Sequence, residues 1–190
     1  MACPYGMSDH PLFLNLKRDH DKIRSKLKDA STIESQRNLL EWLSKEVEES
    51  LHHQEEVLLY PILEGNPKLA EGGPYCTLYY DHHLNHPPAK IAQKITGKEV
   101  AWEPHQVHFR ELQSSLLIPL EEHRSMRAIL KHLRENQLAD SAFQLAFGAY
   151  RSLLDLHLTK EERCFFRVCQ SLLTKAELDT LLAKWIQLRA

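Results

Sequence analysis

The most informative pattern in this chain is a set of histidines and glutamates that recurs in the same order in both halves. His20 and His123 each stand four residues before an arginine, and each is followed some thirty residues later by a His-x-x-x-Glu step. Residues four apart on a helix project from one face, so each step presents an imidazole and a carboxylate to one point. The pattern therefore predicts a two-metal site with six ligands: His20, His52, Glu56, His123, His157 and Glu161.

The spacing of these residues indicates two similar helical hairpins. His20 precedes His123 by 103 positions, and the second histidine and the glutamate of each half are 105 positions apart. A single His-x-x-x-Glu step is usually a solvated surface pair, but two steps with matching partners are much harder to produce by chance. Arg24 and Arg127 occupy equivalent positions. They either hydrogen-bond the metal-binding carboxylates or form surface ion pairs, and the sequence leaves both interpretations open.

The elements that position these residues are predicted to be helices. Glycine is scarce, with 6 in 190 residues, and apolar residues keep helical spacing almost everywhere. We predict an all-α, up-and-down four-helix bundle in one domain over residues 1–190, with Pro119 kinking the third long helix. The four long helices are expected at about 11–30, 31–63, 105–135 and 140–173, a capping box at Ser31 and Glu34 starting the second. A central insertion at about 66–104 and a short C-terminal helix at about 174–188 complete the prediction.

Composition and charge exclude several classes of partner. The formal net charge of −2 gives no electrostatic case for binding nucleic acid or an anionic membrane. The chain has no apolar stretch long enough to span a membrane and no signal-peptide pattern at its start, so we expect a soluble, cytoplasmic protein. Its four cysteines lack C-x-x-C spacing, which favours reduced thiols. For Cys164 and Cys169, packing is favoured over a redox role. The sequence does not indicate the oligomeric state.

The donor types indicate which metal the site would hold. Imidazoles combined with carboxylates that can bridge suit pairs of iron or manganese ions, whereas copper or structural zinc would more often recruit thiolates. We therefore predict two non-haem iron ions as the cofactor, with manganese or zinc as less favoured substitutes.

The chain resembles the hemerythrin-like family, whose His-His-Glu cation-binding domains are four-helix bundles with a non-haem di-iron centre. The resemblance covers nearly the whole chain. The motifs that carry it are Lys17-Arg18-Asp19-His20 with Ile23-Arg24, His52-His53-Gln54-Glu55-Glu56 before Tyr60-Pro61, Glu121-Glu122-His123 with Arg127, and His157-Leu158-Thr159-Lys160-Glu161-Glu162 before Phe165-Phe166. The resemblance implies that Glu56 and Glu161 bridge the metals and that the four histidines are terminal ligands.

The chain also departs from this pattern in two ways. Oxygen-carrying members take a fifth histidine one turn away on the third helix, where this chain has Pro119 and Arg127, which argues against reversible oxygen carriage. Glu55, not Glu56, stands six residues before Pro61 as the family's first glutamate commonly does, although helical spacing favours Glu56. The second-rank ligands are therefore Glu55, His53, His82, His83 and His86, and the last three lie in the insertion as a lid or, in the favoured interpretation, an exposed loop.

These features predict a protein that binds or reacts with dioxygen, peroxide or nitric oxide, in sensing, scavenging or detoxification under oxidative stress. As an enzyme it would be a di-iron oxidoreductase of peroxidase or nitric oxide-detoxifying type, with Tyr60 among the tyrosines that could donate an electron or a proton. The alternatives are an iron-binding or storage protein and a metal-free helical interaction module.

Overall fold

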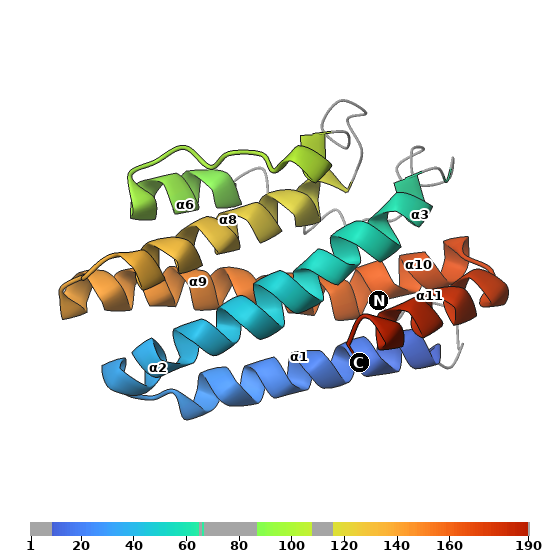
Figure 1. Ribbon diagram of the computed structural model, residues 1–190, viewed down its shortest axis with the longest axis horizontal. Helices are drawn as coiled ribbons and strands as arrows, with labels where there is room; N and C mark the ends of the chain where they lie inside the picture. Colours follow the sequence, from blue (N-terminus) through green and yellow to red (C-terminus); the bar gives the residue numbers. More distant parts are fainter. Residues whose placement is uncertain (1–8, 65, 67–86, 108–115, 190) are drawn as a thin grey trace.

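The regular structure of the chain is helical throughout the part that can be described. The computed structural model describes residues 9–64, 66, 87–107 and 116–189, and within these ranges every element is a helix (Figure 1). This confirms the predicted all-α class. The histidines of the insertion, His82, His83 and His86, lie outside the described residues. None of the described helices has both the length and the apolar character that a membrane span needs.

The first helix, α1 (Pro11–Asp29), begins and ends close to the predicted positions. The ring Nδ1 of its N-cap residue, His10, accepts a hydrogen bond from the backbone N–H of Leu12 at 3.2 Å, and Pro11 fits the first helical position. Its inward face carries five apolar residues and His20. The second helical run begins one residue later than the capping box at Ser31 would place it: Thr32 is the N-cap and exchanges hydrogen bonds with Ser35.

The two long helical runs that carry the His-x-x-x-Glu steps both contain π-helical turns. The first run consists of α2 (Ile33–Leu43), the π segments η1 (Ser44–His52) and η2 (Glu55–Leu59), and α3 (Tyr60–Glu64). The second consists of α9 (Asp140–Lys160), the π segment η4 (Glu161–Phe165) and α10 (Phe166–Leu172). A π turn holds one more residue than an α turn, so it changes which side chains share a face. His52, Glu55 and Glu161 all lie at the ends of these segments.

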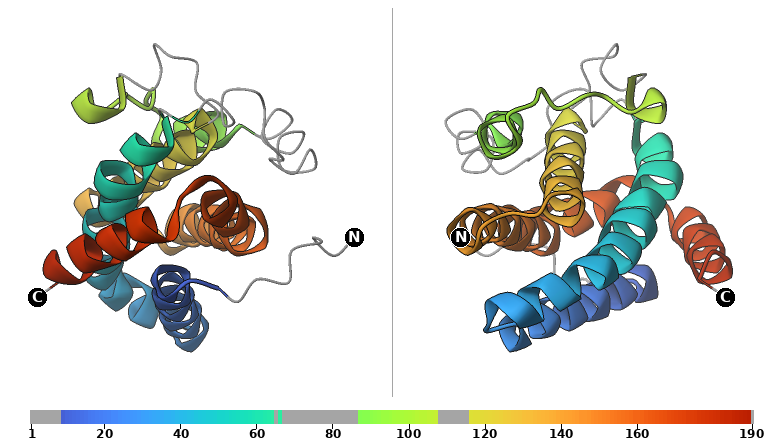
Figure 2. Two further views of the ribbon diagram at one scale, coloured as in Figure 1. Left: turned by 90° about the vertical axis from the view of Figure 1, so that its right-hand side faces the viewer. Right: turned by 60° about the vertical axis from the view of Figure 1, so that its left-hand side comes forward.

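The long helices lie side by side around one apolar core. Figures 1 and 2 show α1, the run from α2 to α3, α8 (Leu117–Glu135) and the run from α9 to α10 arranged as elongated rods. The helix α8 packs along α9, and α2 contacts both of them, while α1 contacts α9. The C-terminal helix α11 (Lys175–Gln187) packs against α1 and η2, and buries Trp185. Its bounds match the predicted helix at 174–188.

The third long helix differs most from its prediction. We expected it to begin near His105, but residues 104–106 form a single 3₁₀ turn, η3 (Pro104–Gln106), and α8 starts at Leu117. Pro119 consequently lies in the first turn of α8, where a missing backbone N–H requires no partner, and not inside a helix that it would kink.

The described part of the insertion covers the outer face of α8. Its helix α6 (Pro88–Thr96) packs against α8 and α9. Further along, Arg124 donates a hydrogen bond to the carbonyl of Val100 at 2.5 Å and stacks its guanidinium on Trp102, 3.9 Å from the ring centre. With this cover in place, the five consecutive residues of α8 from 122 to 126 are all buried. The insertion thus removes the region around His123 from solvent.

Candidate metal centre

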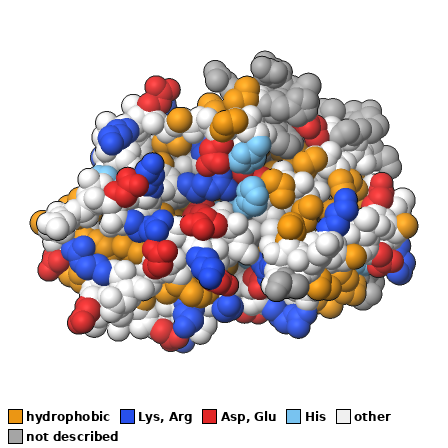
Figure 3. Space-filling model, in the orientation of Figure 1, with side chains coloured by type: hydrophobic (Ala, Val, Ile, Leu, Met, Phe, Trp, Pro, Cys, Tyr) orange, Lys and Arg blue, Asp and Glu red, His pale blue; other side chains and the backbone are white. Residues whose placement is uncertain are grey.

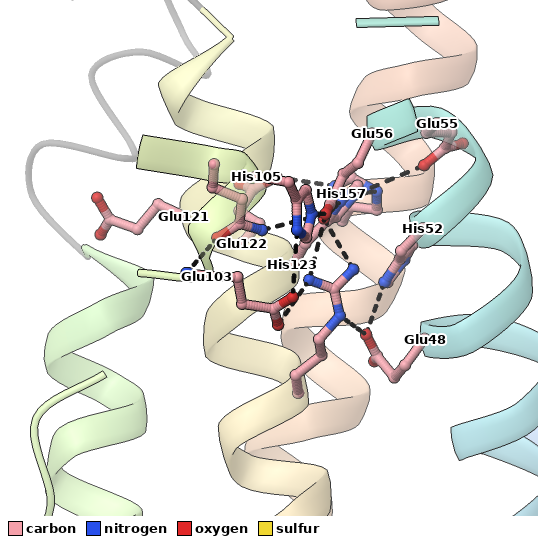
Figure 4. A network of polar contacts seen from close by, with 12 residues as sticks. Glu48, His52, Glu55, Glu56, Glu103, His105, Glu121, Glu122, His123 and His157 are labelled. Carbon is pink, nitrogen blue, oxygen red and sulfur yellow. Dashed lines mark hydrogen bonds and ion pairs between the residues drawn. The ribbon is translucent and has the colours of Figure 1, made fainter. Parts of the chain in front are cut away.

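The four predicted histidines are all buried and come from four different helical segments. Each uses its ring Nδ1 to contact a glutamate carboxylate, and Figure 4 shows three of these pairs, which involve Glu48, Glu56 and Glu122. The Nδ1-to-oxygen distances are 2.9 Å for His20 with Glu162, 2.8 Å for His52 with Glu48, 2.8 Å for His123 with Glu56 and 2.9 Å for His157 with Glu122. Because Nδ1 is held in every case, the opposite nitrogen, Nε2, is the one left to face the interior.

The rings of His52, His123 and His157 form a tight cluster. The first two are stacked, with ring centres 4.0 Å apart and planes 7° apart, and His157 stands edge-on to both. The Nε2 atoms of His123 and His157 are 3.1 Å apart. All three rings offer a ligand atom within 4.8 Å of the others, a spacing that one metal ion could span.

Two carboxylates enter this cluster from the π-helical segments. Glu55 places Oε2 3.5 Å from Nε2 of His123. Glu161 lies between two histidines, with Oε1 3.6 Å from Nε2 of His157 and Oε2 3.4 Å from Nε2 of His20. Glu55, His123, His157 and Glu161 form a second group whose ligand atoms all lie within 4.8 Å of one another. His20 therefore joins the cluster through Glu161.

Several buried donor and acceptor atoms at the centre lack a hydrogen-bond partner among the described residues. They are both carboxylate oxygens of Glu55, both of Glu161, and the Nε2 atoms of His20 and His52. A buried polar atom without a partner costs about 1–3 kcal/mol, and a buried charge costs more. These six atoms lie in or beside two overlapping groups of buried ligands, and bound cations would supply the partners that they lack.

The structure places Glu56 differently from Glu55. Oε1 of Glu56 contacts His123 on its Nδ1 side, away from the Nε2 cluster, and the same carboxylate accepts hydrogen bonds from Arg127 and Gln106. The four-residue step that pointed to Glu56 assumes α-helical geometry, but it crosses from η1 into η2. Between His157 and Glu161 the chain is α-helical, because α9 ends at Lys160. There the four-residue spacing does bring both side chains together.

The repeated His-x-x-x-Arg pattern now has a structural explanation. Nη1 of Arg24 donates to Oε1 of Glu162 at 2.6 Å, and Nη2 of Arg127 donates to Oε1 of Glu56 at 2.8 Å. In each half, the arginine binds the same carboxylate that holds the histidine one turn earlier on its own helix. The arginines therefore contact the glutamates behind the histidines, and neither makes a hydrogen bond to Glu161.

We call the four glutamates that contact Nδ1 of the histidines, Glu48, Glu56, Glu122 and Glu162, the outer glutamates. Glu48 and Glu122 also contact a second donor, on the side away from the histidine. The hydroxyl of Tyr150 donates to Oε1 of Glu48 at 2.9 Å, and the ammonium of Lys160 pairs with Glu122. Burial lowers the pKa of Lys160 to about 8. Every one of the four histidines is thus oriented by a carboxylate that is itself bound from outside, the arrangement that fixes ring tautomer and direction in histidine metal sites.

Burial and neighbouring charges set the ionisation of the central residues. Burial lowers the pKa of His52, and burial together with the nearby His52 holds the pKa of His123 well below its usual value, so both rings are neutral and able to bind metal. Burial and then the charges of Glu161 and Glu56 raise the pKa of Glu55 well above 4.5. For Glu161, burial is outweighed by His157 and His20, which lower its pKa.

The remaining predicted residues lie around the cluster and not in it. His53 is exposed, and its ring centre is 6.1 Å from that of His105. Tyr60 is buried with its ring nearly parallel to that of His123, 5.8 Å between centres. None of the described residues outside the six at the centre adds a fifth imidazole to it, and the candidates His82, His83 and His86 lie outside the described part of the chain.

Sequence reasoning missed five residues that contact this site or its surroundings. They are Glu48, Glu103, His105, Glu122 and Glu162. Glu48 stands four residues before His52, and that spacing could have identified it. The adjacent positions of Glu122 and Glu162 within the repeated motifs were also a usable signal. His105 had none, because its contact with η2 spans 49 residues.

Comparisons of the chain with models of protein families, with curated proteins and with solved structures give no match.

Proposed function

We propose that this chain is a hemerythrin-like protein, a four-helix bundle with a non-haem di-iron centre that binds or reacts with dioxygen, peroxide or nitric oxide. The observation that carries the proposal is a buried cluster in which the Nε2 atoms of His20, His123 and His157 lie 3.4–3.6 Å from the carboxylates of Glu55 and Glu161, with His52 stacked on His123. Neither carboxylate has a hydrogen-bond partner among the described residues. Burying six such groups in the apolar interior of a helical protein is unfavourable on its own, whereas a pair of cations would stabilise all of them.

The residues that would hold the metals are the four histidines with Glu55 and Glu161. We assign Glu55 in place of Glu56 because its oxygens are unpartnered and face the Nε2 cluster, while Glu56 is bound to Nδ1 of His123 and to Arg127. Glu161 contacts histidines on both sides, which is the position of a bridging carboxylate.

The donor set favours iron or manganese over softer metals. It contains imidazoles and carboxylates only, and the two described cysteines, Cys164 and Cys169, are outside both buried ligand groups. Burial, followed by the charges of Glu161 and Glu55, raises the pKa of the Cys169 thiol well above its usual value, so it stays protonated and is a poor ligand.

Protein residues around the centre would control its reactivity. When bound, two irons would supply the electrons needed to bind or reduce a small oxidising ligand. The outer glutamates keep the imidazoles in one orientation, while Phe165, Phe166 and Tyr60 are buried beside the centre and exclude water. Tyr150 remains protonated because burial and the charge of Glu48 raise its pKa. Its hydroxyl is therefore held as a donor to Glu48.

Metal analysis of the anaerobically reduced protein, with absorption spectra before and after oxygen, tests the proposal. We expect two irons per chain in the buried centre and a spectral change on oxygenation. His52→Ala and Glu161→Ala should each abolish that stoichiometry, whereas His132→Ala, a change at a partly exposed histidine of α8, should preserve it. Unchanged metal content in His52→Ala and Glu161→Ala would refute the assignment.

Kinetics separate the two classes of di-iron function. A persistent, reversible oxygenated spectrum would support a binding role, and rapid consumption of peroxide or nitric oxide with a reductant would support an oxidoreductase. The four-histidine set, without a fifth imidazole among the described residues, favours the second class.

A further inference from the structure

A second group of metal-binding side chains lies outside the buried centre, where residues 103–106 meet η2. Glu56, Glu103 and His105 each offer one ligand atom, and the three atoms lie within 4.8 Å of one another. The side chain of His105 is 35% exposed, whereas that of Glu56 is fully buried. Figure 3 shows histidine side chains on this face among acidic and basic ones, and Figure 4 shows His105 and Glu103 beside the buried histidines.

Both carboxylates in this group contact the guanidinium of Arg127 and the imidazole of His105. Arg127 donates to Oε1 of Glu56 at 2.8 Å and to Oε1 of Glu103 at 3.1 Å. The other oxygens face His105, with 2.5 Å from its Nε2 to Oε2 of Glu56 and 3.7 Å from its Nδ1 to Oε2 of Glu103. Gln106 also donates to Oε2 of Glu56, at 3.2 Å. Nη1 of Arg127 also donates to Oε2 of Glu56, at 3.4 Å, so this oxygen contacts Arg127, Gln106 and His105 together, while Oε2 of Glu103 faces His105.

The charge balance of the region favours a further cation. The guanidinium of Arg127 lies within 4.0 Å of three carboxylates, with 3.8 Å to Glu48, 2.8 Å to Glu56 and 3.1 Å to Glu103. At this distance, and among the described residues, one guanidinium therefore faces three carboxylates, while Lys131 and Arg134 line the adjoining cavity. Like charges held this close repel one another, and in a partly buried site a divalent ion relieves the repulsion better than solvent does.

The group borders a cavity that opens to the surface. The cavity has a volume of about 560 Å³, and its lining includes Glu48, His53, Glu103 and Arg127. His53 is exposed, and its ring stands at 83° to that of His105. A hydrated metal ion fits such a space, and the nearby imidazole and carboxylates can replace part of its water shell.

We propose that Glu56, Glu103 and His105 form a third cation site, which takes one divalent transition-metal ion from solvent and delivers it to the buried pair. One nitrogen and two oxygens suit Fe²⁺, Mn²⁺ or Zn²⁺. Glu56 provides the connection, because one of its oxygens faces this outer site and the other contacts His123 of the buried centre. The delivery role rests on the proposed function, but the existence of the outer site does not.

Counting bound Co²⁺ per chain tests the outer site. The wild-type protein should bind three ions, and His105→Ala and Glu103→Gln, both changes at accessible side chains, should each lose one and keep two. Two matched controls should keep all three: His132→Ala, a histidine of α8 outside the group, and Glu135→Gln, which lines the same cavity without belonging to the group. Equal Co²⁺ content in wild type, His105→Ala and Glu103→Gln would overturn the proposal, as would an equal loss in the controls.

The same titration distinguishes failure of the outer site from failure of the buried centre. If only the outer site is wrong, wild type and His105→Ala both bind two ions. If only the buried centre is wrong, wild type binds one ion and His105→Ala none. The combined change of His52 and His157 to alanine should remove the buried ions and leave one, which is then lost when His105→Ala is added.

The rate of metal uptake tests delivery. Metal-free protein mixed anaerobically with Fe²⁺ should fill the buried pair about tenfold more slowly in His105→Ala than in wild type, the loss typical of removing an outer metal contact, and should reach the same final content there. A rate equal to that of wild type would overturn the delivery role.

Discussion

Glu55 and Glu56 are competing candidates for one ligand position in the buried centre. The two side chains are adjacent in sequence, yet one has unpartnered oxygens in the buried cluster and the other holds His123 from behind. Glu55→Gln should therefore abolish metal binding at the buried centre. Glu56→Gln should weaken it by about 10–100-fold, as expected for a residue that orients a ligand. Competition with a chelator measures both, and the reverse ranking would show that Glu56 is the ligand.

Glu55 should also destabilise the metal-free protein. An acid whose pKa is raised on folding lowers the free energy of unfolding by about 1.4 kcal/mol per pKa unit, and the loss develops as pH rises from the ordinary value of 4.5 towards the raised one. Metal-free Glu55→Gln should therefore be more stable than metal-free wild type at mildly alkaline pH, and the difference should shrink in acid. Urea unfolding of chelator-treated protein measures this, and a pH-independent difference would contradict it.

Five of the six predicted metal-binding residues lie in the buried cluster, and the sixth, Glu56, contacts His123 from its Nδ1 side. The histidines were found because their spacing repeats, and repetition does not depend on the exact helical geometry. The choice of Glu56 depended on an α-helical turn between two positions that the structure places in π segments. Hydrophobic spacing does not predict that change, because π turns are rare, short interruptions of α-helices.

At the scale of helices, the two halves are built alike, and this provides an internal comparison. On α1, Arg24 binds the glutamate behind His20, and on α8, Arg127 binds the glutamate behind His123. The side chain of Arg24 is 30% exposed and that of Arg127 only 17%, and Arg127 also binds Glu103. The second arginine should therefore be the more important of the two.

This comparison gives a paired prediction. Arg24→Gln and Arg127→Gln should each weaken metal binding at the buried centre, within the range of about 10–100-fold expected for outer contacts, and Arg127→Gln should have the larger effect. Arg37→Gln is a suitable control, since Arg37 pairs with Asp140 on the surface, away from the metal ligands. Chelator competition on all three variants measures the effect. Affinity unchanged in both test variants would show that these arginines form only surface ion pairs.

Helix boundaries show which elements can be predicted from sequence and which cannot. The starts of α1 and α11 were predicted within one or two residues because the cap residues and proline act locally. The start of α8 was predicted twelve residues too early, at 105 in place of Leu117. Helical spacing continues before Leu117, although residues 104–106 turn away to meet η2. This change of direction depends on contacts between residues far apart in the sequence, which hydrophobic periodicity cannot predict.

For the molecule as a whole, the covering of α8 by the insertion could not be predicted from sequence. The insertion was recognised as an interruption of the helical pattern, but its contacts with Arg124 join residues more than twenty positions apart. The result is a centre enclosed by protein on the side of α8, with the half-buried Glu103 and the exposed His105 beside Glu56. Enclosure makes the buried carboxylates costly without a cation, which links metal content to the stability of the entire fold.

Metal binding should therefore stabilise the whole molecule. The six proposed ligands come from α1, the η1 to η2 region, α8, and the junction of α9 with η4, so a bound metal would join segments that separate when the chain unfolds. A ligand that binds only the folded state adds about 2.7 kcal/mol to the free energy of unfolding at a free concentration one hundred times its dissociation constant. Urea unfolding with and without Fe²⁺ under anaerobic conditions should show a larger increase in wild type than in His157→Ala, which keeps only the proposed outer site. An equal increase in both would mean that the stabilising ion binds elsewhere than among these helices.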